Sequence, residues 1–144
     1  MKVSGTRRLR VAIVSGDSQF ADGLARWIAV HDGALEVVLS VANWGDLLND
    51  PGFPTDLAVV DAASSQRKSI ESRVRTIRAS GTAVLVVTAA DPDDDPQRAL
   101  SAGAFTVLEK SVPFGLIDEM ARGALGLPLA PPSDTAPDPT PGRR

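Results

Sequence analysis

The sequence predicts an α/β domain with a doubly wound, five-stranded parallel sheet. Over residues 9–125, five short apolar runs alternate with amphipathic segments, which is the order expected of a parallel sheet with helices on both faces. The runs are continuously apolar, as strands buried on both sides are. The chain has 144 residues, of which 43% are hydrophobic, and these figures fit one domain with a substantial core.

The five apolar runs are the expected strands. Each has the length of a buried strand, and each gives way to polar or turn-forming residues. The runs are Leu9–Val14, Leu35–Val41, Leu57–Val60, Val84–Val87 and Ala104–Leu108.

The segments that follow the runs repeat their apolar residues at helical spacing, which predicts five helices. The first helix runs for about 13 residues from Ser18, and either Ser18 or Asp17 can cap it. The others are a short helix capped by Asn43, a helix over residues 66–80, a short helix ended by Gly103, and a last helix from Pro113 to about Leu125.

The helix predicted over residues 66–80 has one apolar and one basic face. Ile70, Val74 and Ile77 point inward at helical spacing. We expect the opposite face to be solvated, as charged helix faces usually are. Its cations are Arg67, Lys68, Arg73, Arg75 and Arg78.

Proline divides the chain into two parts. Six of the 11 prolines lie in the final segment, Leu127–Arg144, where proline disfavours both a helix and a central strand. We therefore expect a domain over residues 8–126 and a semi-extended linker or tail over residues 127–144. A linker of this kind leads to another domain, so this segment is either a true terminus or the connection to a further unit.

The sequence carries no targeting or membrane signal. The basic N-terminal residues lead only to the short apolar run Val11–Val14, whereas a secretory segment needs about 7–15 apolar residues. No stretch approaches the roughly 20 apolar residues of a membrane span. The expected location is the cytoplasm, with no membrane partner.

Composition excludes several classes of enzyme. The chain has no cysteine and a single histidine, His31, which excludes thiol nucleophiles and multi-histidine metal sites within one chain. The triplet Gly16-Asp17-Ser18 is similar to the first block of GDS-type esterases, but their histidine base lies in a late Asp-x-x-His block that this sequence lacks. We therefore expect a protein that is not an enzyme.

Polar residues with complementary chemistry follow three successive strands. Asp61 ends the third strand, Thr88 ends the fourth, and Lys110 follows the fifth. The carboxyl ends of parallel strands share one edge of the sheet, where the sites of open α/β sheets collect. An aspartate can accept a phosphoryl group, while a threonine donates to its oxygens and a lysine neutralises them. The arrangement predicts a phosphoryl acceptor, and transfer would need a magnesium ion.

With these residues in place, the chain resembles the receiver domain of bacterial response regulators over nearly all of residues 8–125. The patterns F-x-x-G-L (Phe20, Gly23, Leu24) and A-L-x-A-G-A (Ala99–Ala104) resemble the NarL/LuxR-type branch. The matching segments are LRVAIVSGDSQFADGLARWI, TDLAVVDAASS and VLVVTAADPDDDPQRALSAGAFTVLEKSVPFGLIDEM.

The resemblance implies a flavodoxin-like (βα)5 fold with strand order 2-1-3-4-5. It also assigns the phosphoacceptor position to Asp61, the switch hydroxyl to Thr88 and the lysine of the family to Lys110.

Several family positions are altered in this sequence. The family holds magnesium with two adjacent acids after the first strand, and those positions are Ser15 and Gly16 here. Asp17 lies one residue off, because the family spacing to the helix phenylalanine is four residues and Phe20 is four from Gly16. The Met-Pro pair after the phosphoacceptor is replaced by Ser64-Ser65, and the aromatic switch position before the lysine is Val107.

These departures indicate an atypical receiver that signals by conformation or dimerisation, with little or no phosphorylation of Asp61 and weak or absent magnesium binding. Two alternatives stay open. Asp17 and Asp61 together could form a weak metal site in a weakly phosphorylated receiver. A small molecule could instead occupy the vacated pocket near Ser15, Gly16 and Thr88.

The resemblance also implies partners. A second copy of the chain would bind through the fourth helix, fifth strand and fifth helix, or through the first and fifth helices. A histidine kinase is a further candidate partner. DNA would be bound only through a helix-turn-helix output domain beyond the proline-rich segment.

Overall fold

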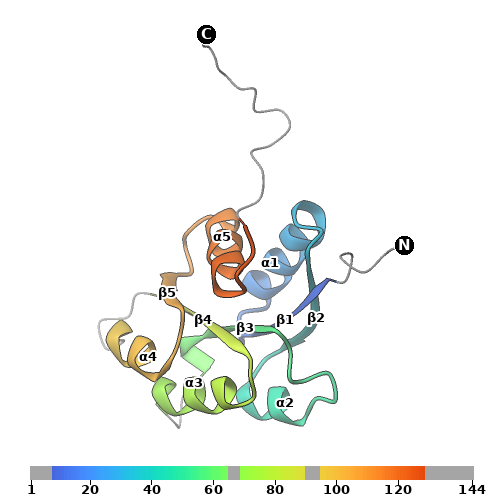
Figure 1. Ribbon diagram of the computed structural model, residues 1–144. Coiled ribbons are helices and arrows are strands. Elements are labelled where there is room, and N and C mark those ends of the chain that lie inside the picture. Colours follow the sequence, from blue (N-terminus) through green and yellow to red (C-terminus); the bar gives the residue numbers. More distant parts are fainter. Residues whose placement is uncertain (1–7, 65–68, 90–94, 129–144) are drawn as a thin grey trace.

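The computed structural model describes residues 8–64, 69–89 and 95–128. These residues form a five-stranded parallel sheet in the order β2-β1-β3-β4-β5, which confirms the predicted fold class and the order 2-1-3-4-5 (Figure 1). The strands are β1 (Leu9–Val14), β2 (Leu35–Val41), β3 (Leu57–Asp61), β4 (Ala83–Thr88) and β5 (Thr106–Glu109).

Helices cover both faces of the sheet. On one face lie α1 and α5, and on the other lie α2, α3 and α4 (Figure 1). The helices are α1 (Ser18–His31), α2 (Trp44–Asn49), α3 (Ile70–Ala79), α4 (Pro96–Ala102) and α5 (Phe114–Ala124), and a single 3-10 turn, η2 (Ala62–Ser64), follows β3.

Two apolar layers explain why the strands are apolar throughout. In β1, Val11 and Ile13 pack in the layer under α1 and α5, whereas Ala12 and Val14 pack in the layer under α2, α3 and α4. All four side chains are buried. In β3 and β4, which lie inside the sheet, the only polar residue is the last one, which places the polar site at the carboxyl edge.

The fifth strand begins later than predicted. We expected it over Ala104–Leu108, but it covers Thr106–Glu109. The chain leaves α4 through Gly103, whose φ of 118° lies in the left-handed region that favours glycine. Ala104 then donates its backbone N–H to the carbonyl of Ala99, so two residues are used in turning from the helix into the sheet.

Two helices also begin later than predicted. Ser69 caps α3 by accepting a hydrogen bond from the N–H of Ser72, and the helix starts at Ile70. Residues 66–68 of the predicted helix lie outside the described residues. Pro113 is the N-cap of α5 rather than its first helical residue.

The prediction of a fully solvated basic face on α3 is wrong at Arg73. That side chain is 7% exposed, and its guanidinium lies 4.8 Å from the centre of the Trp44 ring. The Trp44 ring on α2 and the Arg73 side chain on α3 pack against each other between the two helices. This packing overrides the tendency of arginine to be solvated. Arg75 and Arg78 are exposed as expected, and Arg67 and Lys68 lie outside the described residues.

The first residues of the predicted linker rest on the domain. Leu127 packs against the layer under α1 and α5, and the carbonyl of Pro128 accepts a hydrogen bond from Nε of Arg122 at 2.9 Å. Residues 129–144 lie outside the described residues, so the linker and its output domain stay predictions. Within the described ranges, no helix combines the length and apolarity that a membrane crossing requires.

Candidate functional site

The three residues predicted from the strand ends lie together at the carboxyl edge of the sheet. Asp61 is the last residue of β3, Thr88 is the last of β4, and Lys110 follows β5. The backbone N–H of Lys110 donates to the carbonyl of Thr88 at 2.8 Å, which continues the pairing of β4 with β5 past the strand. The parallel register therefore brings side chains together that are 49 residues apart in the sequence.

Asp61 is buried and hydrogen-bonded through both oxygens. Its side chain is 2% exposed. Oδ2 accepts a hydrogen bond from the Ser15 hydroxyl at 2.8 Å and one from Nζ of Lys110 at 2.9 Å. Oδ1 accepts from the backbone N–H of Ala63 at 3.0 Å. These donors compensate for the burial of a carboxylate.

Ser15 has a direct role that the sequence did not reveal. We treated it as the loss of an acid, yet its hydroxyl donates to Asp61 and accepts from the backbone N–H of Asp17 at 3.0 Å. The signal was present in the register, because Val14 pairs with Val60 and the next residues are Ser15 and Asp61. A hydroxyl at that position is the simplest neighbour that can donate to a carboxylate.

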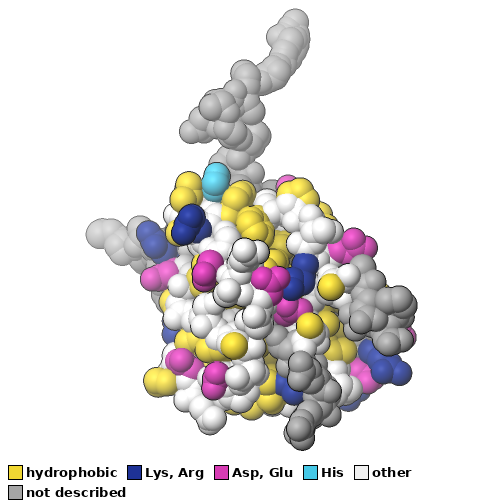
Figure 2. All heavy atoms as spheres, turned by 180° about the vertical axis from the view of Figure 1, so that it is seen from behind, with side chains coloured by type: hydrophobic (Ala, Val, Ile, Leu, Met, Phe, Trp, Pro, Cys, Tyr) yellow, Lys and Arg dark blue, Asp and Glu magenta, His cyan; other side chains and the backbone are white. Residues whose placement is uncertain are grey.

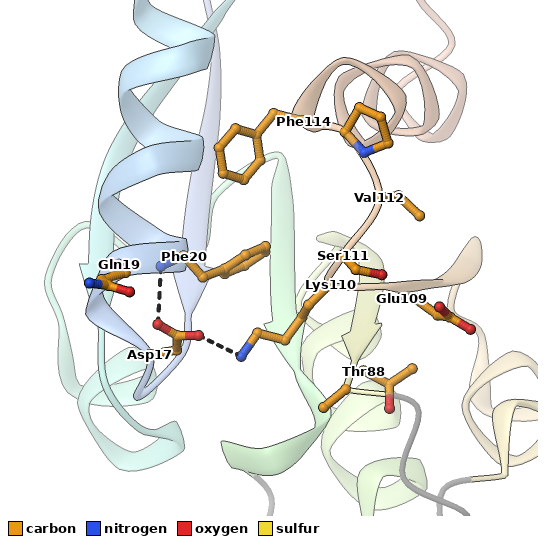
Figure 3. Close-up of a pocket in the computed structure, with 11 residues that line it drawn as sticks. Asp17, Gln19, Phe20, Thr88, Glu109, Lys110, Ser111, Val112 and Phe114 are labelled. Carbon is orange, nitrogen blue, oxygen red and sulfur yellow. Dashed lines mark hydrogen bonds and ion pairs between the residues drawn. The ribbon is translucent and has the colours of Figure 1, made fainter.

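Asp17 reaches the same lysine from the other side. One oxygen, Oδ1, caps α1 by accepting the N–H of Phe20 at 3.1 Å. The other, Oδ2, lies 3.0 Å from Nζ of Lys110 (Figure 3). Gly16 contributes no side chain to this network. A single ammonium group thus bridges two carboxylates, one buried and one 44% exposed.

The charges in this network support one another. Burial acts to lower the pKa of Lys110, but the hydrogen bonds and negative charges of Asp61 and Asp17 outweigh it, and the pKa is raised. The hydrogen bond from Lys110, together with that from the N–H of Phe20, lowers the pKa of Asp17. Lys110 and Asp17 therefore keep their opposite charges across the neutral pH range.

The side-chain carboxylates that could hold a magnesium ion at this edge are those of Asp17 and Asp61. Magnesium takes six oxygen ligands in near-octahedral geometry. Here Asp17 and Asp61 both direct Oδ2 at the ammonium of Lys110, which occupies the position between them. Among the described residues, no group of three or more histidine, aspartate or glutamate side chains is placed to hold a metal ion.

Two cavities lie on either side of the Asp17–Lys110 ion pair. One of about 420 Å³ is lined by Asp61 and by Asn43 of the α2 cap, and the other, of about 680 Å³, is lined by Thr88. Asp17 and Lys110 line both cavities, and Figure 3 shows the second one. Asp61 and Thr88 thus line different cavities, and Thr88 also lines a third one beneath α4.

Of the remaining altered positions, Ser64 and Val107 are among the described residues. Val107 is half-buried and lines a third cavity of about 270 Å³ beneath α4. Ser64 ends the 3-10 turn after β3, and Ser65 lies outside the described residues. The acidic segment that precedes α4 is described only at Asp95, which caps that helix.

An esterase site is not assembled in this fold. Ser18 is the first residue of α1 and His31 is the last, so the 14-residue helix separates them by about 20 Å. The ring of His31 is stacked on Trp27 with ring centres 4.3 Å apart. The Gly16-Asp17-Ser18 triplet is instead the turn and cap that start α1.

The structure is similar to solved receiver domains. The signal receiver domain of the response regulator NarL from Mycobacterium tuberculosis matches with a TM-score of 0.68 and 21% identity, over 83% of this chain and 95% of that one. The BeF3-activated receiver domain of DrrB matches with a TM-score of 0.70 and 18% identity, over 83% and 99%. A LuxR-family response regulator from Aurantimonas sp. SI85-9A1 matches with a TM-score of 0.66 and 21% identity, over 84% and 88%.

The sequence itself matches no protein-family model and no curated protein. The likeness is therefore one of three-dimensional structure, and it confirms that the chain has the receiver-domain fold.

Proposed function

We propose that this chain is the receiver domain of a transcriptional response regulator that signals through conformation and self-association, with little or no phosphorylation of Asp61. The observation that carries the proposal is the ammonium of Lys110, which bridges Asp17 at 3.0 Å and Asp61 at 2.9 Å. The fold, which is that of receiver domains of NarL and LuxR-type regulators, supports the first half of the proposal.

The network around Asp61 opposes phosphoryl transfer. A carboxylate attacks phosphorus through an oxygen lone pair, and Oδ2 of Asp61 already accepts two hydrogen bonds. A cation must also neutralise the transferring oxygens. With Ser15 and Gly16 in place of two acids, the carboxylates needed to hold magnesium are missing from the positions where the family has them.

A self-associating surface is supported by exposed apolar side chains at α4 and β5. Leu100 on α4 is 37% exposed, and Phe105, just before β5, is 49% exposed. The ring of Phe105 lies over Gly123 of α5, where an added Cβ would come within 3.1 Å of it. These residues favour the face built from α4, β5 and α5. On the face shown in Figure 2, apolar atoms reach the surface in small groups among charged ones.

Incubation with acetyl phosphate and Mg²⁺, followed by intact-mass analysis, tests the proposal. We expect the unmodified mass for the full chain. A stoichiometric phosphoryl adduct that disappears in Asp61→Asn would overturn the proposal. Analytical ultracentrifugation of Phe105→Ser tests the self-association face, with Leu48→Ser on α2, which is 41% exposed, as an apolar control outside it. Only the first change should weaken dimerisation.

A weakly phosphorylated receiver is the second candidate, and the position of Asp17 favours it. Its carboxylate contacts the same lysine as Asp61 and faces the same cavity. This candidate predicts a substoichiometric adduct that is lost both in Asp61→Asn and in Asp17→Asn. An adduct that survives Asp17→Asn would count against the role of Asp17.

A further inference from the structure

A cavity of about 680 Å³ opens between the first turn of α1 and the connection from β5 to α5. In Figure 3, Lys110 extends across it toward Asp17, the ring of Phe20 lies beside the lysine, and Phe114 lies above. The proposed function uses Lys110 and Asp17 but gives this space no occupant. The volume is within the range of small-molecule sites, and the lining combines apolar and charged groups as such sites do.

The apolar wall of the cavity is made of two aromatic rings that are held in place. The centres of the Phe20 and Phe114 rings are 6.1 Å apart and their planes are tilted by 58°. Gly23 of α1 has no side chain, and a Cβ there would come within 3.0 Å of the Phe114 ring. This glycine lets the ring lie close against the helix, and Val112 and Pro113 extend the wall. Phe20 is 7% exposed and the ammonium of Lys110 lies 5.4 Å from its ring centre, so a flat apolar group could pack mainly on Phe114.

The charged part of the cavity is negative overall. Asp17 and Glu109 line it, and Asp61 lies behind the ammonium of Lys110, which is the single cation among the described lining residues. Asp17 and Asp61 both contact that ammonium, while Glu109 is directed away from it (Figure 3), so carboxylates outnumber the single cation. Because Lys110 is already paired with both aspartates, it offers little to an anion, whereas Asp17 remains 44% exposed. Electrostatics and the aromatic faces therefore both favour a cation.

We propose that this cavity binds a small organic cation of the arylalkylamine class. Its ring would pack on Phe114 beside Phe20, and its ammonium would bind the exposed carboxylate of Asp17. On binding, the ligand replaces Lys110 as the partner of Asp17 and leaves the lysine to Asp61 alone. The regulatory meaning of this exchange rests on the proposed function, since it makes the network at Asp61 respond to a ligand instead of a phosphoryl group.

Three probes of matched shape and different charge test the inference. The full ¹⁵N-labelled chain is titrated with 2-phenylethylamine, 2-phenylethanol and phenylacetate, and the amide shifts of residues 17–20 and 110–114 are followed. We expect saturable shifts with the amine, and a dissociation constant at least tenfold lower than for either other probe. Equal affinities for the three probes, or no saturable shift with the amine, would overturn the inference.

Variants locate the binding site. Asp17→Asn keeps the helix cap, because asparagine caps as well as aspartate, but it removes the charge. It should weaken amine binding about tenfold, and Phe114→Leu should weaken it by removing part of the aromatic wall. Asp22→Asn, at an exposed position on α1 outside the cavity, should leave binding unchanged. Equal binding by Asp17→Asn and wild type would contradict the proposed site. The acetyl phosphate experiment measures phosphorylation of Asp61 and does not depend on amine binding. The proposed function and the proposed amine site can therefore fail separately.

Discussion

Two clusters in this molecule contain the same groups, two aspartates and one cation, at opposite ends of α1. At its start, Lys110 bridges Asp17 and Asp61. At its end, both oxygens of Asp32 accept from Nη1 of Arg122 at 3.1 Å, and Asp118 lies beside them. Asp32, Asp118 and Arg122 are all buried, and Oδ1 of Asp118 has no hydrogen-bond partner.

The two clusters differ in which groups stay charged. The lysine cluster opens to water at Asp17, and its pair of carboxylates shares one ammonium. In the arginine cluster, burial together with the hydrogen bond and charge of Asp32 raises the pKa of Asp118 to about 7. Solvent access, rather than composition, therefore decides whether the second carboxylate of a cluster remains ionised.

Replacing the cation of each cluster should give the largest difference between the two clusters in the free energy of unfolding. Arg122→Met leaves a buried carboxylate without its partner, and we expect a loss of about 3–5 kcal/mol in the free energy of unfolding. Lys110→Met should lose less, about 2 kcal/mol, because it takes one charged donor from the buried carboxylate of Asp61, which keeps its bonds to Ser15 and Ala63, while Asp17 reaches water. Urea denaturation at pH 7 measures both losses. Equal losses would contradict the stronger dependence of the arginine cluster on its cation.

Asp118→Asn should change how stability depends on pH. The folded state holds the Asp118 proton up to about pH 7, whereas the unfolded chain releases it near pH 3.8. Folding stability contributed by this group therefore falls as pH rises from about 4 to 7 and then levels off. The variant should lack this fall and be more stable by up to about 4 kcal/mol at pH 8. Urea denaturation at pH 5 and at pH 8 measures this dependence. The same change in the free energy of unfolding between the two pH values in both proteins would contradict the raised pKa.

Ser15→Ala should have a smaller effect, confined to the lysine cluster. It removes the hydroxyl that donates to Asp61 at 2.8 Å and leaves Lys110 on the same oxygen. We expect a loss of about 1 kcal/mol in urea denaturation. Ser18→Ala, at an exposed position, is the matched control and should stay within about 0.5 kcal/mol of wild type. A loss no larger than the control's would show that the hydroxyl is dispensable.

Asp17→Asn should give the smallest effect, with the opposite sign of pH dependence to Asp118. Since the folded-state pKa of Asp17 is lowered, its contribution is present above its unfolded pKa of about 3.8 and is lost as pH falls through the lower folded value. The variant should therefore show a slightly shallower loss of stability on the acid side. Thermal unfolding between pH 2 and pH 5 measures it, and a steeper acid limb in the variant would contradict the sign.

The sequence predicted the backbone of the site because the relevant rules are local. Continuous apolar runs marked the strands, and the polar residues that follow them placed Asp61, Thr88 and Lys110 at one edge of the sheet, where the structure has them. The order of the strands followed from the family resemblance. None of these inferences required knowledge of a side-chain direction.

Side-chain partners depend on packing between distant elements, and those were not predicted. Asp32 and Arg122 are 90 residues apart, and only the docking of α5 on α1 joins them. A signal for Asp118 and Arg122 did exist, since they lie on the same face of α5 as Ile117 and Ala121, which are buried. The burial of Arg73 likewise needed the position of Trp44 on a separate helix.

Ser15 and Gly16, which stand where the family has two acids, are the residues on which the proposed lack of phosphorylation most directly depends. Beryllofluoride mimics an acyl phosphate and needs a divalent cation and a free aspartate. A Cβ added to Gly16 would meet nothing closer than the carbonyl oxygen of Ala42 at 3.9 Å, so a side chain can begin there without a clash. Amide shifts near Asp61 during titration with beryllofluoride and Mg²⁺ compare the wild type with the double variant Ser15→Asp, Gly16→Asp. We predict saturable, Mg²⁺-dependent binding in the double variant and none in the wild type. Tight, Mg²⁺-dependent binding by the wild type would contradict the proposal that Asp61 undergoes little or no phosphorylation.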